Sequence, residues 1–180
     1  MISQTLGGNL SGTNDTAPVL SSSGVPTNAG ESYRRTFTYS QDGKNLLQSE
    51  TDTVTGKITL YQYKKGTDLL IAKLIGDGKK ILLREFYEYD PSAILIKTIV
   101  DDGSTADPHD LKDVSERLIR VVIPKAEMPC LGLPEWIEEY GVDITSNQPI
   151  LIGRQKNTYT NAGWLQSQEH FDSEGVLQYT

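Results

Sequence analysis

The residues best suited to binding a metal ion lie in one acidic stretch near the middle of the chain. Four aspartates fall within ten residues and surround His109, namely Asp101, Asp102, Asp107 and Asp110. Hard cations such as Ca²⁺ prefer oxygen ligands of this kind. The spacing lacks the central glycine and the distal glutamate of an EF-hand loop. We therefore expect a solvated acidic loop and predict no metal site.

Catalytic groups are scattered rather than arranged in a recognisable motif. His109 and His170 are the two histidines, stand 61 residues apart and are each expected at the surface. A glycosidase needs paired carboxylates, and one segment offers a set of them, Glu135, Glu138, Glu139 and Asp143. Because the chain holds 24 carboxylates, this pairing is unspecific. No nucleophile motif and no phosphate-binding glycine loop is present, so we expect no enzymatic activity, catalytic residue or cofactor.

Aromatic side chains offer a different kind of site. Trp136, Trp164 and the nine tyrosines could form a platform on which sugar rings stack. The competing explanation, which we favour, is that they pack as cross-strand pairs within a sheet. If the chain binds sugars, Trp136 and Trp164 are the residues that we expect to contact them.

Composition restricts the remaining classes of function. The 180 residues suffice for one ordinary domain, and 37% of them are hydrophobic. A net charge of −7 argues against a nucleic-acid partner, because phosphate contact needs clustered Lys and Arg. The single cysteine, Cys130, excludes an internal disulfide and is expected to be packed and inert. No stretch suits a transmembrane segment, and residues 1–5 show no Sec signal, which leaves the localisation unknown.

A turn signal recurs every ten to thirteen residues along much of the chain. It falls at Asp42-Gly43, Thr55-Gly56, Lys65-Gly66, Asp77-Gly78, Pro91, Asp102-Gly103, Ala162-Gly163 and Glu174-Gly175. The residues between the turns are rich in Tyr, Ile, Leu, Thr and Val, which favour strands. A strand of about six to ten residues plus a short turn gives this step. The sequence therefore predicts an all-β fold of successive antiparallel hairpins.

This pattern places individual strands. We expect them at residues 36–39, 58–63, 69–75, 81–89, 94–100 and 149–156, and at 114–123, where a helical start is the alternative. The pair Asp77-Gly78 predicts a type I′ turn, in which both residues have positive φ. Residues 81–89 carry apolar and aromatic side chains on both faces, so we expect neither face to be simply solvated.

Two parts of the chain depart from the hairpin pattern. Residues 1–30 are rich in Ser, Gly, Thr, Asn and Pro, which predicts a flexible leader before a β domain at residues 31–180. Residues 104–153 interrupt the turn signal, and Pro124, Pro129 and Pro134 predict a Pro-rich irregular insertion there. Within it, residues 134–141 allow either a helical turn, with Pro first and Gly after its end, or a strand.

The turn-bearing segments share a short motif: an aromatic residue, two or three polar residues, a glycine, one further residue and an apolar residue. The motif residues are Tyr39, Gly43, Tyr63, Gly66, Tyr89, Asp90, Tyr159, Gly163, Phe171, Asp172, Gly175 and Leu177. The first three aromatic residues are 24 and 26 residues apart, which corresponds to two strands per repeat.

Each motif position has an expected role in a hairpin. The aromatic residue ends one strand, and an aspartate caps the turn through a bond to the backbone. Glycine supplies the positive φ, and the apolar residue starts the return strand on the buried face.

The motif resembles the YD repeat of RHS (rearrangement-hotspot) proteins, which is roughly Tyr-Asp-x-x-Gly-Arg-Leu, and residues 171–177 are the nearest copy. The resemblance covers residues from about 33 to 103 and from 150 to 180. Most copies lack the full Tyr-Asp pair or the Arg, and the segment that closes the shell in the family is missing. The resemblance implies an antiparallel hairpin array that forms a curved, open part of an RHS-type β-shell.

The resemblance also implies a structural function. In bacterial RHS and Tc-type toxin proteins, YD repeats enclose a toxic C-terminal domain, so this chain is expected to be a stretch of that wall. The expected partners are further repeats or a cargo domain of a parent protein, and exposed strand edges are expected to associate. The family implies a secreted or cell-surface location. The alternative is a carbohydrate or cell-surface binding module that uses exposed Trp and Tyr.

Overall fold

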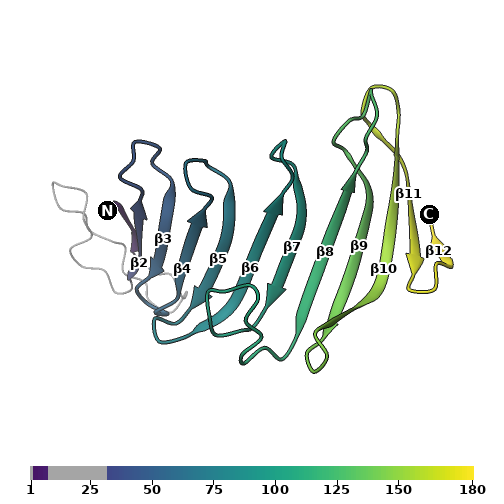
Figure 1. Ribbon diagram of the computed structural model, residues 1–180. Coiled ribbons are helices and arrows are strands. Elements are labelled where there is room, and N and C mark those ends of the chain that lie inside the picture. Colours follow the sequence, from purple (N-terminus) through teal and green to yellow (C-terminus); the bar gives the residue numbers. More distant parts are fainter. Residues whose placement is uncertain (1, 8–31) are drawn as a thin grey trace. The chain divides into compact units, whose positions relative to one another are not determined.

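The computed structural model describes residues 2–7 and 32–180 (Figure 1). Every regular element in this part of the chain is a β-strand, which confirms the predicted all-β class. The strands form one open antiparallel sheet, and each is hydrogen-bonded to its neighbours in sequence. Their bounds are β1 (Ile2–Gly7), β2 (Ser32–Tyr39), β3 (Leu47–Asp52), β4 (Ile58–Tyr63), β5 (Leu70–Gly76), β6 (Ile81–Tyr89), β7 (Leu95–Asp101), β8 (Arg117–Pro124), β9 (Pro134–Asp143), β10 (Gln148–Tyr159), β11 (Leu165–Asp172) and β12 (Leu177–Tyr179). Within the described ranges, no helix has the length and hydropathy to span a bilayer.

The chain divides into two compact units, whereas the sequence predicted one domain over residues 31–180. One unit comprises Met1–Tyr61 and Ile75–Lys80, and the other comprises Gln62–Leu74 and Ile81–Thr180. Two of the boundaries fall inside β4 and β5. No linker of distinctive composition marks them, so sequence patterns gave no sign of the division.

The first unit begins with a strand where the sequence predicted a flexible leader. β1 pairs with β2 from Ile2 opposite Phe37 to Gly7 opposite Ser32. Backbone hydrogen bonding along this register orders a segment that is poor in large apolar groups. Residues 2–7 are therefore a strand rather than part of a leader, and residues 8–31 of that leader lie outside the described residues. β2 pairs in turn with β3, and β3 with β4.

The core of the second unit lies on one face of its sheet. Its cluster of buried apolar residues comprises Ala72, Leu74, Phe86 and Ile99, against which Ile81 and Ile119 pack. Phe86 stands opposite Ile99, and Ile99 opposite Ile119, because register partners share a face. On the other face of β6, Glu85 and Tyr87 are half-buried. The prediction that neither face of this strand is simply solvated is confirmed.

Regular strands occupy much of the stretch that was predicted to be irregular. Residues 104–153 contain β8, β9 and part of β10. Pro124 ends β8 and Pro134 starts β9, positions at which a missing N–H disturbs the ladder least. Pro129 lies in the loop between them, after a cis bond from Met128. For residues 134–141 the strand alternative is thus confirmed and the helical turn is wrong, while residues 102–116 and 125–133 form the irregular loops.

The turn between β5 and β6 also differs from its prediction. Gly78 has a φ of 81°, but Asp77 is not among the positive-φ residues, so the type I′ turn is wrong. The Asp77 side chain instead caps the loop, because its Oδ1 accepts hydrogen bonds from the N–H groups of Lys79 and Lys80 at 2.9 and 3.0 Å. β5 begins and ends within one residue of the strand predicted at residues 69–75. The strands predicted at residues 58–63 and 81–89 coincide with β4 and β6.

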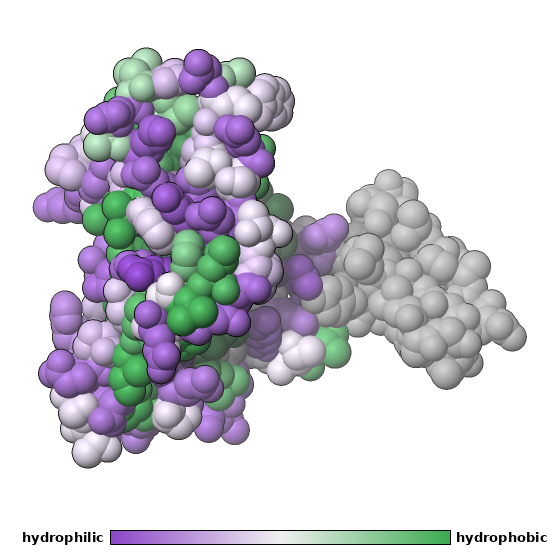
Figure 2. All heavy atoms as spheres, turned by 90° about the vertical axis from the view of Figure 1, so that its right-hand side faces the viewer, coloured by the Kyte–Doolittle hydropathy of each residue, from purple (hydrophilic) through white to green (hydrophobic). Residues whose placement is uncertain are grey.

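β12 is one edge of the open sheet, as the prediction of exposed strand edges requires. Viewed towards this edge, apolar side chains lie among polar ones on the surface (Figure 2). The exposed apolar residues of the last two hairpins are Ile150, Ile152, Trp164, Leu165, Val176, Leu177 and Tyr179.

Candidate functional site

Three hairpins of the second unit share one five-residue turn, at residues 90–94, 160–164 and 172–176. In each, the N–H of the first residue donates to the carbonyl of the fifth at 2.9–3.1 Å. The N–H of the fourth residue donates back to the carbonyl of the first, also at 2.9–3.1 Å. For these three copies, the repeat seen in the sequence is also a repeat of backbone geometry, whereas the turns that contain Gly43 and Gly66 close over longer loops.

A side chain caps each of these turns. Asp90 Oδ1 accepts a hydrogen bond from the N–H of Ile94 at 2.8 Å, and Asp172 Oδ1 accepts one from the N–H of Val176 at 2.9 Å. In the third turn the Thr160 hydroxyl takes the place of the carboxylate and accepts from the N–H of Trp164. The predicted aspartate cap is confirmed for Asp90 and Asp172.

The fourth position of the turn requires a left-handed backbone. Gly163 and Gly175 have φ values of 82° and 83°, and Ala93 is held at 64° in the equivalent position. Gly43 and Gly66, in other turns, have φ values of 81° and 80°. The role predicted for the motif glycines is confirmed, and Ala93 is the copy in which a side chain occupies a conformation that favours glycine.

The motif tyrosines end strands, as predicted, and two of them anchor a neighbouring strand. Tyr39, Tyr63, Tyr89 and Tyr159 are the last residues of β2, β4, β6 and β10. The hydroxyl of Tyr89 donates to the carbonyl of Leu70, the first residue of β5, at 2.9 Å. The hydroxyl of Tyr159 donates to the carbonyl of Pro134, the first residue of β9, at 2.7 Å. Burial raises the pKa of Tyr159, which keeps the donor protonated.

Phe171 is the motif aromatic without a hydroxyl, and it packs instead. It is the penultimate residue of β11, and its ring lies 5.8 Å from that of Trp136. The apolar position that follows each turn was predicted to be buried. This is wrong for Leu177, which is 50% exposed, and for Leu95 and Leu165, because an open single sheet offers no second layer to cover them.

The acidic stretch is only in part the solvated loop that the sequence predicted, because Asp107 and His109 are exposed whereas Asp101, the last residue of β7, is buried. The carboxylate of Asp101 is fully buried and lies between two arginines, 2.5 Å from Arg84 Nε and 2.7 Å from an Arg117 nitrogen. Arg84 itself has no exposed surface. Its remaining N–H groups donate to the backbone carbonyls of Thr105, Asp107 and Asp110 at 2.8–3.0 Å.

The loop of residues 102–116 therefore wraps around the guanidinium group of Arg84. Gly103 makes the wrapping possible, because a Cβ there would lie 2.3 Å from an Arg84 nitrogen. Asp102 closes the loop by accepting hydrogen bonds from Ser115, whose hydroxyl is the main cause that lowers the pKa of Asp102 to about 2. In the described part of the chain, no three His, Cys, Asp or Glu residues gather as metal ligands.

The two tryptophans considered for sugar contact lie in different environments. Trp136 is half-buried in β9, with the charged groups of Arg154 and Lys156 each 5.5 Å from its ring. Trp164 is 74% exposed in the turn between β10 and β11. Trp136 stands opposite Lys156 in the register, and its ring packs against that of Phe171. Trp136 fits the cross-strand packing explanation, and Trp164 does not.

The carboxylates considered for glycosidase chemistry all lie on β9. Glu138 and Glu139 are adjacent in the strand and point to opposite faces. The hydroxyl of Tyr140 donates to Glu138 at 2.7 Å, and this bond raises the pKa of Tyr140. The exposed carboxylate of Glu139 lies on the other side of the sheet. Neighbouring strand positions therefore separate these two groups.

The remaining candidates are also placed. His109 is exposed in the loop, whereas His170 is half-buried and stacks on Tyr179 with 4.3 Å between ring centroids. Cys130 is 3% exposed, and its Sγ lies 3.3 Å from the Thr160 carbonyl, which confirms that the thiol is packed.

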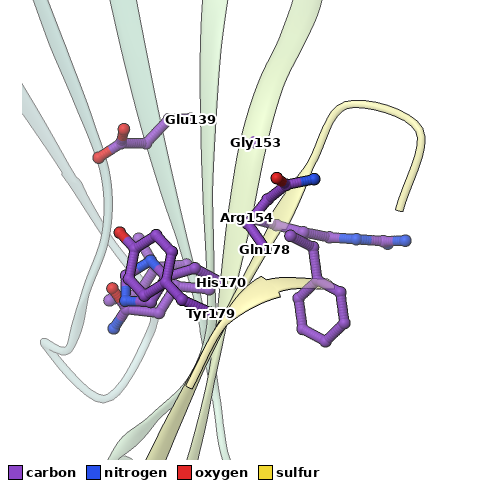
Figure 3. A pocket seen from close by; sticks show the side chains of 9 residues that line it. Glu139, Gly153, Arg154, His170, Gln178 and Tyr179 are labelled. Atoms are coloured by element: carbon purple, nitrogen blue, oxygen red, sulfur yellow. The ribbon is translucent and has the colours of Figure 1, made fainter. Parts of the chain in front are cut away.

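A hollow of about 310 Å³ lies at the end of the second unit, between β9 and β12 (Figure 3). Its lining residues are Ile137, Glu139, Gly153, Arg154, Gln155, His170, Phe171, Gln178 and Tyr179. Gly153 keeps the strands close here, because a Cβ would lie 2.9 Å from the Phe171 carbonyl oxygen. No sequence motif marks this group of residues, which the strand order brings together from four strands.

The sequence matches no known protein family. Comparison with curated proteins found no similar sequence either.

Proposed function

We propose that this chain is a non-catalytic structural segment of an RHS/YD-repeat protein, a stretch of the wall of a shell that encloses a toxic cargo domain. The observation that carries the proposal is the five-residue turn that recurs at residues 90–94, 160–164 and 172–176 with the same hydrogen bonds. A wall must lengthen by adding equivalent units, and a hairpin with a fixed turn is such a unit.

The order of the strands supports the same proposal. Each strand pairs with its neighbours in sequence, so a further hairpin extends the sheet without rearranging the earlier ones. The tyrosine anchors at Tyr89 and Tyr159 tie the end of one strand to the start of its neighbour. Such side-chain bonds support a single sheet that has little second layer.

The partners that follow are further repeats and a cargo domain in a parent protein, and the location that follows is secreted or at the cell surface of a bacterium. Electron microscopy of the purified parent protein tests this architecture. We expect these strands within a continuous sheet that surrounds separate density. A reconstruction in which they form an isolated module, away from any enclosed density, would contradict the proposal.

A second candidate is a carbohydrate or cell-surface binding module, and one observation favours it. Trp164 exposes 74% of its surface at the tip of a hairpin, where a sugar ring can stack on it. Binding to a glycan array that weakens on Trp164→Ala, but not on Val176→Ala in the next hairpin, would support this function. Equal binding by both variants and the native chain would argue against it.

A further inference from the structure

The second unit leaves a row of aliphatic side chains exposed on the face of its sheet that lies opposite the buried core. Leu118 on β8 stands opposite Val100 on β7 and opposite Gly141 on β9. Gly141 stands in turn opposite Ile150 on β10, so the row crosses four successive strands (Figure 1). Ile152 joins it, because its Cδ1 would lie 3.7 Å from a Cβ at Gly141. Exposed apolar side chains that adjoin one another in this way form a candidate contact surface.

A cation and an anion lie next to this row on the same face. Arg120 and Glu139 are register partners on β8 and β9, two residues along from the aliphatic row, and both are exposed. Neither forms an ion pair with another described residue, although Lys97 and Glu88 pair across two strands at 2.9 Å. Both charges therefore remain available to a partner molecule.

The arrangement of these residues is complementary to itself. Consider a two-fold axis that runs along the strands, midway between β8 and β9, and lays one sheet face on the other. This axis places Arg120 of each copy against Glu139 of the other copy. It also places Leu118 against Gly141, where no side chain blocks its approach, and Val100 against Ile150. One axis thus matches both the charged pair and the aliphatic row, and a surface that fits itself in this way is typical of a two-fold dimer.

Charge and spacing also favour a second copy as the occupant. The chain carries a net charge of −7, so two copies repel each other over much of their surface. At this face, however, one cation and one anion balance. Sheets that pack face to face lie about 10 Å apart with their strands within about 30° of each other, a separation that an arginine and a glutamate side chain span together.

We propose that this chain forms a symmetric dimer in which the faces of β7 to β10 stack on each other, joined by Arg120–Glu139 ion pairs between copies and by the row around Leu118. The inference is independent of the proposed function, because stacking of this face requires neither a cargo domain nor a sugar. A contact across four short strands is small for a stable dimer, so the association is weak.

Sedimentation equilibrium of the full chain, combined with charge reversal, tests the dimer. We expect a monomer–dimer equilibrium with a Kd on the order of 10 μM. Arg120→Glu and Glu139→Arg should each weaken it at least about tenfold, because like charges then face each other in the homodimer. An equimolar mixture of the two variants should regain dimers, since both contacts of the mixed dimer join opposite charges. Local distortion of a single variant cannot produce that recovery.

The aliphatic row is tested separately with a matched control. Leu118→Asn should weaken the dimer about tenfold, whereas Ile123→Asn should leave it unchanged. The two residues lie on opposite faces of β8 and are 41% and 42% exposed. A chain that stays monomeric up to about 0.5 mM overturns the proposal. So does a mixture of the charge variants that associates no better than either alone, or equal association of Leu118→Asn and Ile123→Asn. Growth beyond the dimer that none of these substitutions affects would overturn it too, and would indicate pairing through the free strand edges instead.

Discussion

The hydroxyl of Tyr159, at the end of β10, donates a 2.7 Å hydrogen bond to the carbonyl of Pro134, at the start of β9. Tyr89, four strands earlier in the sheet, makes the same bond to Leu70, from the end of β6 to the start of β5. This relationship explains why tyrosine, rather than phenylalanine, suits the end of a strand in these repeats. It fixes the open end of a hairpin pair without needing a second layer.

The carbonyl of Pro134 accepts a second side-chain hydrogen bond, from Asn157 Nδ2 at 3.0 Å. Substitutions at Tyr159 and Asn157 therefore test whether the two hydrogen bonds are energetically coupled. Tyr159→Phe should lower the free energy of unfolding by about 0.5–1.5 kcal/mol, since one donor remains. Asn157→Ala should do the same. The double variant should lose more than the sum, because the carbonyl is then left without either side-chain donor. Urea denaturation of the four proteins measures this, and strict additivity would show that the shared carbonyl does not couple the two.

Arg84 should be the most sensitive residue of the second unit. Arg84→Met removes the cation that Asp101 and three loop carbonyls share, and breaking a buried ion pair typically costs about 3–5 kcal/mol. We expect a lower denaturation midpoint and rapid protease cleavage within residues 103–113. Arg120→Met is the matched control, because Arg120 is exposed on β8 and should change stability by less than about 0.5 kcal/mol. Equal protease resistance of the two variants would contradict the wrapping of the loop around Arg84.

The turn geometry predicts opposite effects at equivalent positions. Ala93→Gly should stabilise the chain by about 0.5–1 kcal/mol, because the left-handed backbone costs an alanine more than the extra freedom of glycine in the unfolded chain. Gly163→Ala should destabilise it by about 1 kcal/mol through backbone strain alone, since the nearest atom to its Cβ would be 3.9 Å away. Thermal denaturation compares them, and a change of the same sign in both would refute the equivalence of the turns.

Asp102 predicts part of the dependence of stability on pH. Its pKa in the folded chain, about 2, lies below the unfolded value of about 3.9. The ionised carboxylate therefore stabilises the fold above about pH 4, and this contribution disappears as the pH falls towards 2. Asp102→Asn should lower the denaturation midpoint at pH 7 and reduce its further fall between about pH 4 and pH 2. Asp68→Asn, at an exposed turn residue, is the control, and identical pH profiles for the two variants would exclude this role.

The hairpin architecture could be predicted from the sequence because its signals are local. Glycine and aspartate indicate turns directly. The strand at residues 58–63 can be recognised from its own composition. The same local reasoning failed at Pro134, since proline disfavours a strand interior but is tolerated at a first residue. Only the pairing of β9 with β8 and β10 decides between a strand and a helical turn at residues 134–141.

The remaining features depend on residues that are distant in sequence. Arg84 and Asp110 are 26 residues apart, and nothing in the acidic stretch itself indicates that its cation comes from β6. One signal was present, since Arg84 shares its strand face with Phe86, a position where an arginine requires a partner. The hollow lined by Glu139 and Tyr179 likewise depends on the strand order, because its lining residues come from the four successive strands β9 to β12. Strand order and register, rather than motifs, determine such sites.

The central claim is that these repeats enclose a cargo domain, and protease protection of that domain in the intact parent protein tests it most directly. The rate of cargo digestion is compared between the native parent and a parent from which residues 32–180 are deleted, with the free cargo domain as the reference. The account predicts slow digestion in the native parent and a rate near that of the free domain after the deletion. Equal digestion rates with and without these residues would contradict it.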